Sequence, residues 1–396
     1  MSNSIVILGD ALQGGAANST GRLTRSLFEK KVPIERWYFA ASPVNKPDYY
    51  HSLDDRSKRP PLERILKNIS RPIADEIRRK RHTKSLHEAV SSKSPAIINV
   101  RNIHDCGLDH NSLRTLPHKV PIIWTLHDCW PFDEHAFTWQ TNGRIEHAAS
   151  DRPGAIERRR NFFHNCPNTV LISPSKWLAT KASKKIARPI RIEVIPNGIT
   201  TKDFFAAPKF DAKAKEELDP DRIWIAFSAT WANSRKGVDL LPAAFRQLNL
   251  NGLGLICWGG KPPLDKFPSN LPIKYVGHLR DPRRIASLYS AADLFLCPSR
   301  ADNLPNTVLE AMACGTPVIG SRIGGIPDMV RPNKTGWLHE SDDADALARA
   351  INQAIAEKDR WPFYRETARN VAVNEYDIDL CAQNYRNLYE ELTPNS

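Results

Sequence analysis

Residues 293–320 read DLFLCPSRADNLPNTVLEAMACGTPVIG and decide the fold. An apolar run over Asp293–Cys297 is followed by a polar loop, by helix-forming residues over Pro305–Ala313, and by a second apolar run over Pro317–Gly320. Proline is favoured in the first turn of a helix, and Gly315 is suited to a helix C-terminus. The pattern therefore predicts a strand, a helix and a second strand in succession.

Apolar runs alternate with helical patterns along the rest of the chain as well. The further strands that we expect are Ser4–Leu8, Ile34–Ala40, Ala96–Val100, Ile122–Leu126, Thr169–Ile172 and Ile190–Ile195 in the first half, and Trp224–Ser228, Gly254–Trp258 and Ile273–Val276 in the second. Helical patterns fall near Ala16–Lys30, Pro72–Val90, Lys176–Lys185, Val238–Leu248, Pro282–Ala291 and Ala344–Glu357. Continuous apolar strands separated by helices are typical of parallel sheets covered on both faces. Two such series predict an α/β protein with two doubly wound, Rossmann-like domains.

The length of 396 residues suits two domains. We place their boundary near Pro196–Gly198, where a strand ends in turn-forming residues and a polar, lysine-rich segment follows. Residues 1–198 then form the first domain and residues 199–374 the second. No strand follows the last helical pattern, Ile378–Leu392, so we expect the C-terminal helix within residues 375–396 to pack back on the first domain.

The composition excludes several classes of protein. Hydrophobic residues make up 41% of the chain and charged residues 25%, which is typical of globular proteins and not of disordered or fibrous ones. No apolar run reaches the ~18 residues that a transmembrane helix needs, and the first residues resemble a strand and not a leader. The seven cysteines lack C-x-x-C spacing, so we expect them to be reduced, with no metal site, in a cytoplasmic protein.

The net charge of +12 is confined to one half of the chain. Residues 1–200 carry 32 Lys and Arg against 19 Asp and Glu, a net +13, and the remainder has a net charge of −1. Within this half, Arg71–Ser92 places Ile73, Leu86 and Val90 among basic residues, an amphipathic pattern. The basic half indicates an anionic partner, for which an anionic membrane, an anionic acceptor and nucleic acid are the candidates. A solvated basic face without a specific partner is the alternative.

The helix predicted within residues 293–320 presents a polar face at its N-terminus. Asn306 and Glu310 are four residues apart and share this face beside Thr307. The helix starts at the carboxyl end of a strand, where open α/β sheets bind ligands and helix amides attract phosphate. Glu310 is suited to a ribose because a carboxylate can accept hydrogen bonds from two hydroxyls at once. An ordinary surface position is the alternative for this residue.

These residues resemble the signature of retaining GT-B glycosyltransferases of glycosyltransferase family 4, in which an acid is followed after seven residues by Glu and then by Ala-Met-Ala-x-Gly-x-Pro-Val. Asp302 and Glu310 match the two acids. Other motifs follow the family's order: Gly14-Gly15, Trp124–Phe132, Ser173–Leu178, Val194–Ile199, Arg235-Lys236-Gly237 and Gly324–Asp328. The stretch His127–Phe132 is similar to enzymes of bacterial exopolysaccharide assembly of the colanic-acid type. The resemblance implies two domains that face each other across a cleft.

The resemblance also implies which residues form the site. The matching positions are His127, Asp302 and Lys236 as catalytic residues, and Gly14, Gly15, Arg235, Lys236, Asn303, Asn306, Thr307 and Glu310 as donor-binding residues. Lys236, with Arg235 beside it, would contact the donor diphosphate, because fixed cations stabilise the charge that gathers on the leaving group. Asp302 would face the donor sugar, and His127 would lie across the cleft near the sugar or the acceptor.

Two positions depart from the family's pattern. Asp302 stands where the first acid is usually Glu, and Thr230 stands where an Arg usually precedes the Lys by six residues. One phosphate-binding cation is therefore absent from its usual place, and Arg235 is the candidate to replace it.

The function implied is that of a metal-independent, retaining hexosyltransferase without a cofactor. It would move a sugar from a UDP- or GDP-linked donor to a glycan or lipid-linked acceptor in surface polysaccharide synthesis, with peripheral contact to an anionic membrane through its basic half. No carboxylate of the first half is clearly placed as a nucleophile, so we expect a front-face displacement.

Other functions are less compatible with the sequence. A non-hydrolysing sugar-nucleotide 2-epimerase is the alternative enzyme, although it would need acid and base carboxylates in the cleft. A nicotinamide dehydrogenase is disfavoured because Gly14-Gly15, followed only by Gly21, breaks the G-x-G-x-x-G pattern. The non-enzymatic alternative is a basic membrane- or nucleic-acid-binding protein, and of these nucleic acid is the weaker because no recognised nucleic-acid module is visible.

Overall fold

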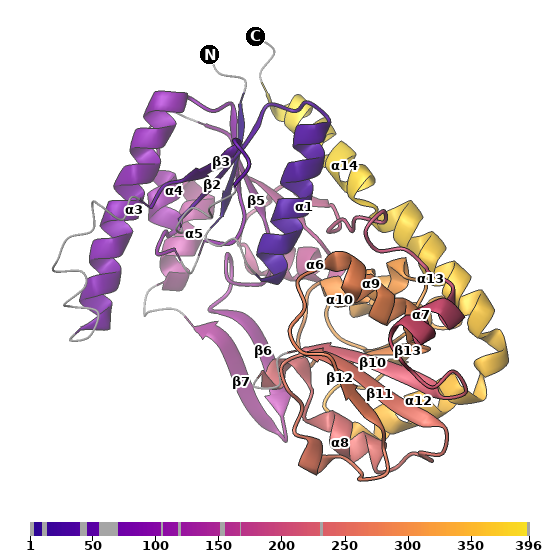
Figure 1. The fold of residues 1–396 in the computed structure, drawn as a ribbon. Helices are drawn as coiled ribbons and strands as arrows, with labels where there is room; N and C mark the ends of the chain where they lie inside the picture. Colours follow the sequence, from indigo (N-terminus) through magenta and orange to yellow (C-terminus); the bar gives the residue numbers. More distant parts are fainter. Residues whose placement is uncertain are drawn as a thin grey trace.

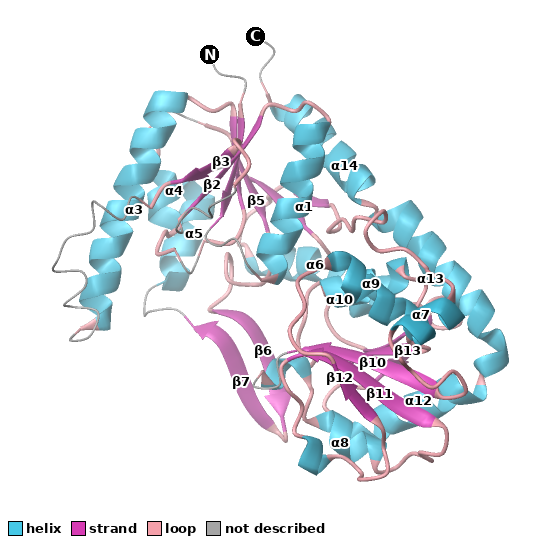
Figure 2. Ribbon diagram, viewed as in Figure 1, coloured by secondary structure: helices cyan, strands magenta, loops and turns pink. Residues whose placement is uncertain are grey.

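The computed structural model describes residues 4–9, 14–39, 46–54, 70–103, 106–117, 120–150, 155–166, 168–229 and 233–393. They form two α/β domains, each built on one parallel sheet with helices on both faces (Figures 1 and 2). The prediction of two doubly wound domains is confirmed. Thr230 in the second half of the chain lies outside the described residues, as do residues 55–69 in the basic first half.

The first domain contains a seven-stranded sheet. In spatial order its strands are β3 (Tyr50–Ser52), β2 (Ile34–Tyr38), β1 (Ile5–Gly9), β4 (Ile97–Val100), β5 (Ile122–Thr125), β8 (Val170–Ser173) and β9 (Ile192–Val194). Successive side chains of β1 enter opposite cores, with Ile5 and Ile7 on one face and Val6 and Leu8 on the other. The sheet is doubly wound because the strand order reverses between β1 and β4.

Different helices cover the two faces of this sheet. The face of Val6 is covered by α3 (Arg71–Lys93), α4 (His110–Arg114), α5 (Ala155–Asn165) and α6 (Lys176–Lys185), and the opposite face by α1 (Gly15–Glu29) and α14 (Ile378–Leu392). Leu86 and Val90 of α3 are fully buried in the core. The C-terminal part of the amphipathic pattern in α3 therefore packs on the sheet, whereas Ile73 near its start is 52% exposed.

The second domain contains a six-stranded sheet. In spatial order its strands are β12 (Ile273–Tyr275), β11 (Leu253–Gly259), β10 (Ile223–Ala229), β13 (Leu294–Cys297), β14 (Val318–Ser321) and β15 (Gly336–His339). The helices are α7 (Lys209–Lys215), α9 (Pro282–Ala291), α10 (Asn306–Ala313), α11 (Ile326–Met329) and α13 (Trp361–Tyr376) on one face, and α8 (Leu240–Phe245) and α12 (Ala344–Ala356) on the other. Short 3-10 turns occur at Ser234–Lys236 (η2), Leu264–Lys266 (η3) and Lys358–Arg360 (η4).

The chain passes between the domains at two adjacent points. The Ile199 backbone N–H donates to the carbonyl oxygen of Tyr376 (2.8 Å), and the Ile378 N–H donates to the carbonyl oxygen of Ile199 (2.9 Å). Gly198 leaves no room for a side chain, because a Cβ there would lie 2.6 Å from Ile378. After this junction α14 lies on the first sheet beside α1, away from the second domain that precedes it (Figure 1).

A two-stranded hairpin belongs to neither sheet. It consists of β6 (His135–Thr141) and β7 (Arg144–Ser150), joined by Asn142 and Gly143 with φ angles of 49° and 76°. Two positive φ angles are what a type I′ hairpin turn requires, and Asn-Gly is its preferred sequence. The apolar runs predict no strand here. The hairpin extends from the first domain toward the second (Figure 1).

Candidate active site

The candidate active site lies where the carboxyl ends of the two sheets meet. The turn after β1 contains Gly14 and Gly15, and the loop after β13 leads into α10. The Asn306 side-chain Nδ2 donates to the Gly15 carbonyl oxygen at 2.9 Å. Gly14 has a φ of 98°, which favours glycine, and a Cβ placed there would meet nothing within 4 Å. The first turn therefore approaches α10 closely and leaves space beside it.

Glu310 lies on α10 and is held by groups from both domains. Its Oε1 is 3.5 Å from Nη2 of Arg22 on α1, and the Tyr289 hydroxyl donates to Oε2 at 3.3 Å. Burial raises the pKa of the Glu310 carboxyl, and Arg22 and Tyr289 only partly oppose this effect. Nη1 of Arg22 and Oδ1 of Asn306 are buried without a hydrogen-bond partner among the described residues. One donor and one acceptor beside Glu310 are thus available to a ligand.

A buried carboxylate and two cations lie at the carboxyl ends of β10 and β13. Lys236 Nζ is 2.6 Å from Asp302 Oδ2, and Arg235 Nη1 is 3.6 Å from Asp302 Oδ1. Burial raises the pKa of Asp302, but Lys236 and Arg235 outweigh it and hold the pKa below the ordinary carboxyl value. Asp302 therefore stays ionised and fixes the Lys236 ammonium in place.

The turn that carries both cations has little freedom to move. Gly237 follows it with a φ of 65°, and a Cβ there would lie 1.9 Å from the Pro298 carbonyl oxygen. Arg300, whose side chain is 1% exposed, donates through Nη1 to the Ser234 carbonyl oxygen at 2.7 Å. Its guanidinium also donates to both carboxylate oxygens of Asp239 (2.6 and 2.8 Å). Arg300, which is itself paired with Asp239, thus supports the η2 turn.

His127 and Asn303 connect the two domains. His127 Nε2 accepts a hydrogen bond from Arg101 Nε at 3.2 Å. Asn303 Nδ2 donates to the His127 carbonyl oxygen (3.2 Å), and Asn303 Oδ1 accepts from the Ser175 hydroxyl (2.6 Å). Both groups of the buried Asn303 amide are therefore used in contacts with the first domain, and this side chain joins the domains.

The structure brings the residues that the sequence singled out into three contacting groups. These are Gly15 with Asn306, Lys236 with Arg235 and Asp302, and His127 with Asn303, while Glu310 lies one turn further along α10 than Asn306. Gly14 precedes α1, and Thr307 is half-buried next to Asn306 at the start of α10.

The predicted site residues do not include Arg22 or two residues of the hairpin, Phe137 and Glu146, which contact Arg235 and Ser234. Arg22 occupies an unremarkable position in a helix and is identified only by its contact with the second domain. The hairpin did have a signal, the Asn142-Gly143 dipeptide between β-forming residues.

No group of three or more His, Cys, Asp and Glu side chains in the described part of the chain is arranged to hold a metal ion. Among the helices described, none has the length and apolarity that crossing a membrane requires.

The two domains are similar to two different protein families. Residues 13–203 match the family described as Glycosyltransferase Family 4, and residues 222–357 match the family described as Glycosyl transferases group 1. The chain is 28% identical over 307 residues to the alpha-maltose-1-phosphate synthase of Mycolicibacterium smegmatis, a match that covers 71% of this chain and 76% of that protein.

Solved structures share the arrangement of both domains. Sucrose-phosphate synthase from Thermosynechococcus elongatus superposes with a TM-score of 0.76 at 19% identity, covering 98% of this chain and 99% of its own. HepE of Anabaena, in a complex with UDP and glucose, superposes with a TM-score of 0.71 at 15% identity over 98% and 99% of the two chains. These similarities show the GT-B fold.

Proposed function

We propose that this chain, which is built from a Glycosyltransferase Family 4 domain and a Glycosyl transferases group 1 domain, transfers a sugar from a UDP- or GDP-linked donor with retention of anomeric configuration. The observation that carries the proposal is the position of the Lys236–Asp302 pair and of Glu310. They follow β10 and β13, two neighbouring strands, at the edge that faces Gly15. Nucleotide ligands bind at this edge of open α/β sheets.

Donor binding would use the start of α10 and the side chain of Glu310. Backbone amides at the start of a helix attract phosphate, and Asn306 and Thr307 occupy this position. Glu310 would accept hydrogen bonds from the ribose hydroxyls. The buried Nη1 of Arg22 offers one more donor to the same ligand.

Bond cleavage would depend on the two cations of η2. As the bond between the sugar C1 and the phosphate oxygen breaks, negative charge gathers on the nucleoside diphosphate, and Lys236 and Arg235 would stabilise it. These side chains would supply the positive charge, so we propose that the reaction needs neither a metal ion nor a cofactor. Asp302 would orient Lys236 and lie beside the donor sugar.

Retention would follow from attack on the face that the leaving group departs from. The acceptor hydroxyl oxygen bonds to C1, and its proton passes to the departing diphosphate oxygen. Glu146 of the first domain accepts a hydrogen bond from Ser234 and Asp302 is paired with Lys236, so neither serves as a nucleophile in our proposal. His127 would contact the sugar or the acceptor from the first domain.

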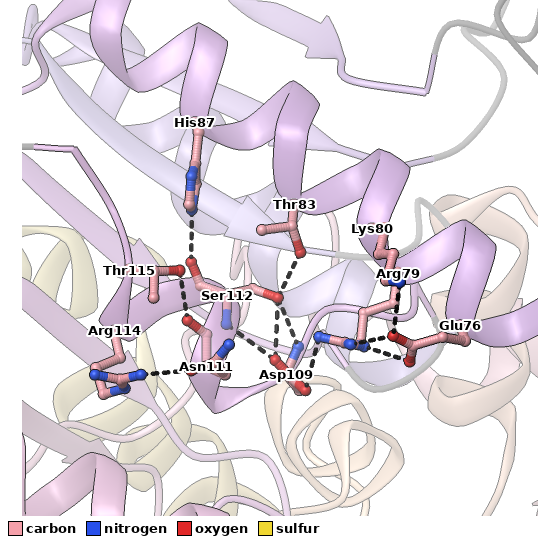
Figure 3. A network of polar contacts seen from close by, with 10 residues as sticks. All are labelled: Glu76, Arg79, Lys80, Thr83, His87, Asp109, Asn111, Ser112, Arg114 and Thr115. Atoms are coloured by element: carbon pink, nitrogen blue, oxygen red, sulfur yellow. Dashed lines mark hydrogen bonds and ion pairs between the residues drawn. The ribbon is translucent and has the colours of Figure 1, made fainter.

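The acceptor would be a glycan or lipid-linked saccharide of surface polysaccharide synthesis, reached at an anionic membrane through α3. Lys80 and Lys84 of this helix have side chains 74% and 78% exposed. Figure 3 shows the inner edge of α3 directed at α4, where Thr83 Oγ1 lies 2.7 Å from Ser112 Oγ and His87 Nε2 lies 3.1 Å from the Ser112 carbonyl oxygen. Because Leu86 and Val90 of α3 are buried, the membrane contact would be mainly electrostatic and weakened by salt.

The transferase proposal is tested with a panel of UDP- and GDP-sugars in the presence of EDTA. We expect one nucleotide class to raise the melting temperature, because a ligand that binds only the native state stabilises it. The anomeric configuration of the product, measured by NMR, tests retention. Formation of an epimer from the donor alone, without an acceptor, would overturn the proposal in favour of an epimerase.

The membrane proposal is tested by sedimentation with vesicles of phosphatidylglycerol and phosphatidylcholine. We expect binding that increases with the phosphatidylglycerol fraction and is lost in Lys80→Glu/Lys84→Glu. Lys215→Glu/Lys358→Glu changes two exposed lysines of the second domain, and with them the net charge, by the same amount and is the matched control. Equal vesicle binding by the wild type and by Lys80→Glu/Lys84→Glu would contradict a role for α3.

A further inference from the structure

The hairpin β6–β7 directs one of its faces toward the second domain. Side chains opposite each other in an antiparallel pair lie on the same face of a hairpin, and here Phe137 pairs with Ala148 and Trp139 with Glu146. Phe137 and Glu146 therefore share a face, and both contact η2 of the second domain, as described next. Ile145 lies on the opposite face and is 63% exposed.

Two side chains of this face hold the turn that carries the phosphate cations. The Ser234 hydroxyl donates to Glu146 Oε2 at 2.6 Å. The Arg235 guanidinium lies over the ring of Phe137, 4.6 Å from its centre, in a cation–π arrangement. The first residue of η2 is thus fixed by a hydrogen bond and the second by an aromatic ring, both supplied by the other domain.

The tip of the hairpin reaches the same turn by a second path. The Asn142 backbone N–H donates to Asp342 Oδ2 at 3.0 Å, and Asp342 Oδ1 accepts from Arg300 Nε at 2.6 Å. Arg300 in turn donates to the Ser234 carbonyl oxygen at 2.7 Å. Ser234 is therefore held through its hydroxyl by the hairpin directly, and through its carbonyl by a chain of contacts that ends at the hairpin tip.

We propose that the β6–β7 hairpin positions the donor-diphosphate cations, with Glu146 and Phe137 as positioning residues that act through Ser234 and Arg235. This inference rests on the proposed function, since it assigns Arg235 and Lys236 to the diphosphate. Preorganised cations stabilise developing charge better than mobile ones, because no reorganisation is needed as the bond breaks. The hairpin can hold these cations in place only while the two domains are in contact. It therefore couples domain closure to assembly of the phosphate site.

The test compares Glu146→Ala with Glu146→Gln, whose amide oxygen can still accept the Ser234 hydrogen bond. We expect Glu146→Ala to weaken binding of UDP or GDP, whichever binds the wild type, and to lower the rate of donor hydrolysis at saturating donor. The expected change is about tenfold, as for the loss of a hydrogen bond to a charged group. Glu146→Gln should recover most of this loss. Ile145→Ala, on the opposite face of the same strand, is the matched control and should behave as the wild type.

A second measurement separates positioning from a general structural role. Ser234→Ala should also weaken donor binding, and the double variant should lose less than the sum of the two single losses, because both variants remove the hydrogen bond between these side chains. Additive losses, or wild-type binding by Glu146→Ala, would overturn the inference.

Amide hydrogen exchange of residues 233–237, which requires no ligand, should be faster in Glu146→Ala than in the wild type or Ile145→Ala. Unchanged exchange would also overturn the inference. A wild type that binds neither UDP nor GDP would refute the proposed function, and the exchange result would then decide the positioning role alone.

Discussion

Arg22 of α1 and Glu310 of α10 form an ion pair between the two domains, although 288 residues separate them along the chain. Nη2 of Arg22 lies 3.5 Å from Oε1 of Glu310, and both side chains are about 15% exposed (16% and 15%). The carboxylate that we assign to the donor ribose is thus held by a cation of the first domain. Donor binding and contact between the domains therefore depend on the same side chain.

We predict that Glu310→Gln loses donor affinity or turnover by more than about tenfold, because an amide accepts hydrogen bonds from ribose hydroxyls less strongly than a carboxylate. The melting temperature at neutral pH should not fall, because the raised pKa of Glu310 shows that its surroundings favour the neutral form. Donor titration by calorimetry and a thermal melt measure the two effects. Glu366→Gln, on the exposed side of α13, serves as the control. Wild-type affinity in Glu310→Gln would contradict the ribose assignment.

The raised pKa of Glu310 also predicts how donor affinity depends on pH. The ribose hydroxyls donate to the ionised carboxylate, so affinity should fall as the pH decreases through the raised pKa, at a higher pH than for an ordinary glutamate. The measurement uses a nucleotide sugar, because the terminal phosphate of a free nucleoside diphosphate titrates near pH ~6 itself. The acid limb should disappear in Glu310→Gln. An identical acid limb in that variant would assign the titration to another group.

The same pKa shift fixes the sign of a stability effect. A folded-state pKa above the unfolded value gives stability that is present at low pH and is lost as the pH rises through the folded pKa. Above its folded-state pKa the wild type lacks this contribution, and Glu310→Gln does not titrate. The difference in unfolding free energy between the two proteins should therefore shrink as the pH is lowered, which urea unfolding at several pH values can measure.

Lys236→Met should reduce the rate at saturating donor by more than about tenfold, because it removes a cation from the developing charge on the diphosphate. It also leaves the buried Asp302 without the main group that lowers its pKa, so the variant should be less stable at neutral pH. Lys236→Met/Asp302→Asn removes both charges and should recover stability without recovering activity. If activity returned together with stability, Lys236 would have only a structural role.

Much of the fold could be predicted from the sequence because local pattern and tertiary position agree. The strand, loop and helix of residues 293–320 occur as β13 and α10, since an apolar strand buried on both faces and a helix with one apolar side carry clear periodicities. The strand β15 and the helix α13 are not among the elements predicted from the sequence. Gly336–His339 is short and begins with glycine, and the buried side of Trp361–Tyr376 includes Ala368 and Ala372, which give a weak apolar periodicity.

The contacts between the domains could not be predicted in the same way. Asn306 with Gly15 and Glu310 with Arg22 join residues almost 300 positions apart, and each pair depends on how two separately folded sheets are placed. The site residues on a single element were accessible from motif spacing. The residues that support them from the other domain, such as Glu146 on Ser234, carry no local signal for that role.

Gly237→Ala should destabilise the second domain and impair the site together. The residue has a φ of 65°, and its Cβ would lie 1.9 Å from the Pro298 carbonyl oxygen, so the η2 turn must shift. Gly252→Ala provides the control, because Gly252 has a φ of 71° in the same domain but nothing within 4 Å of its Cβ. The control should cost about 1 kcal/mol from backbone strain alone, and Gly237→Ala should cost roughly 2 kcal/mol or more in urea unfolding. Equal losses in the two variants would show that the turn can move away from Pro298 freely. In that case the fixed position of Lys236 would have to come from Asp302 and the hairpin.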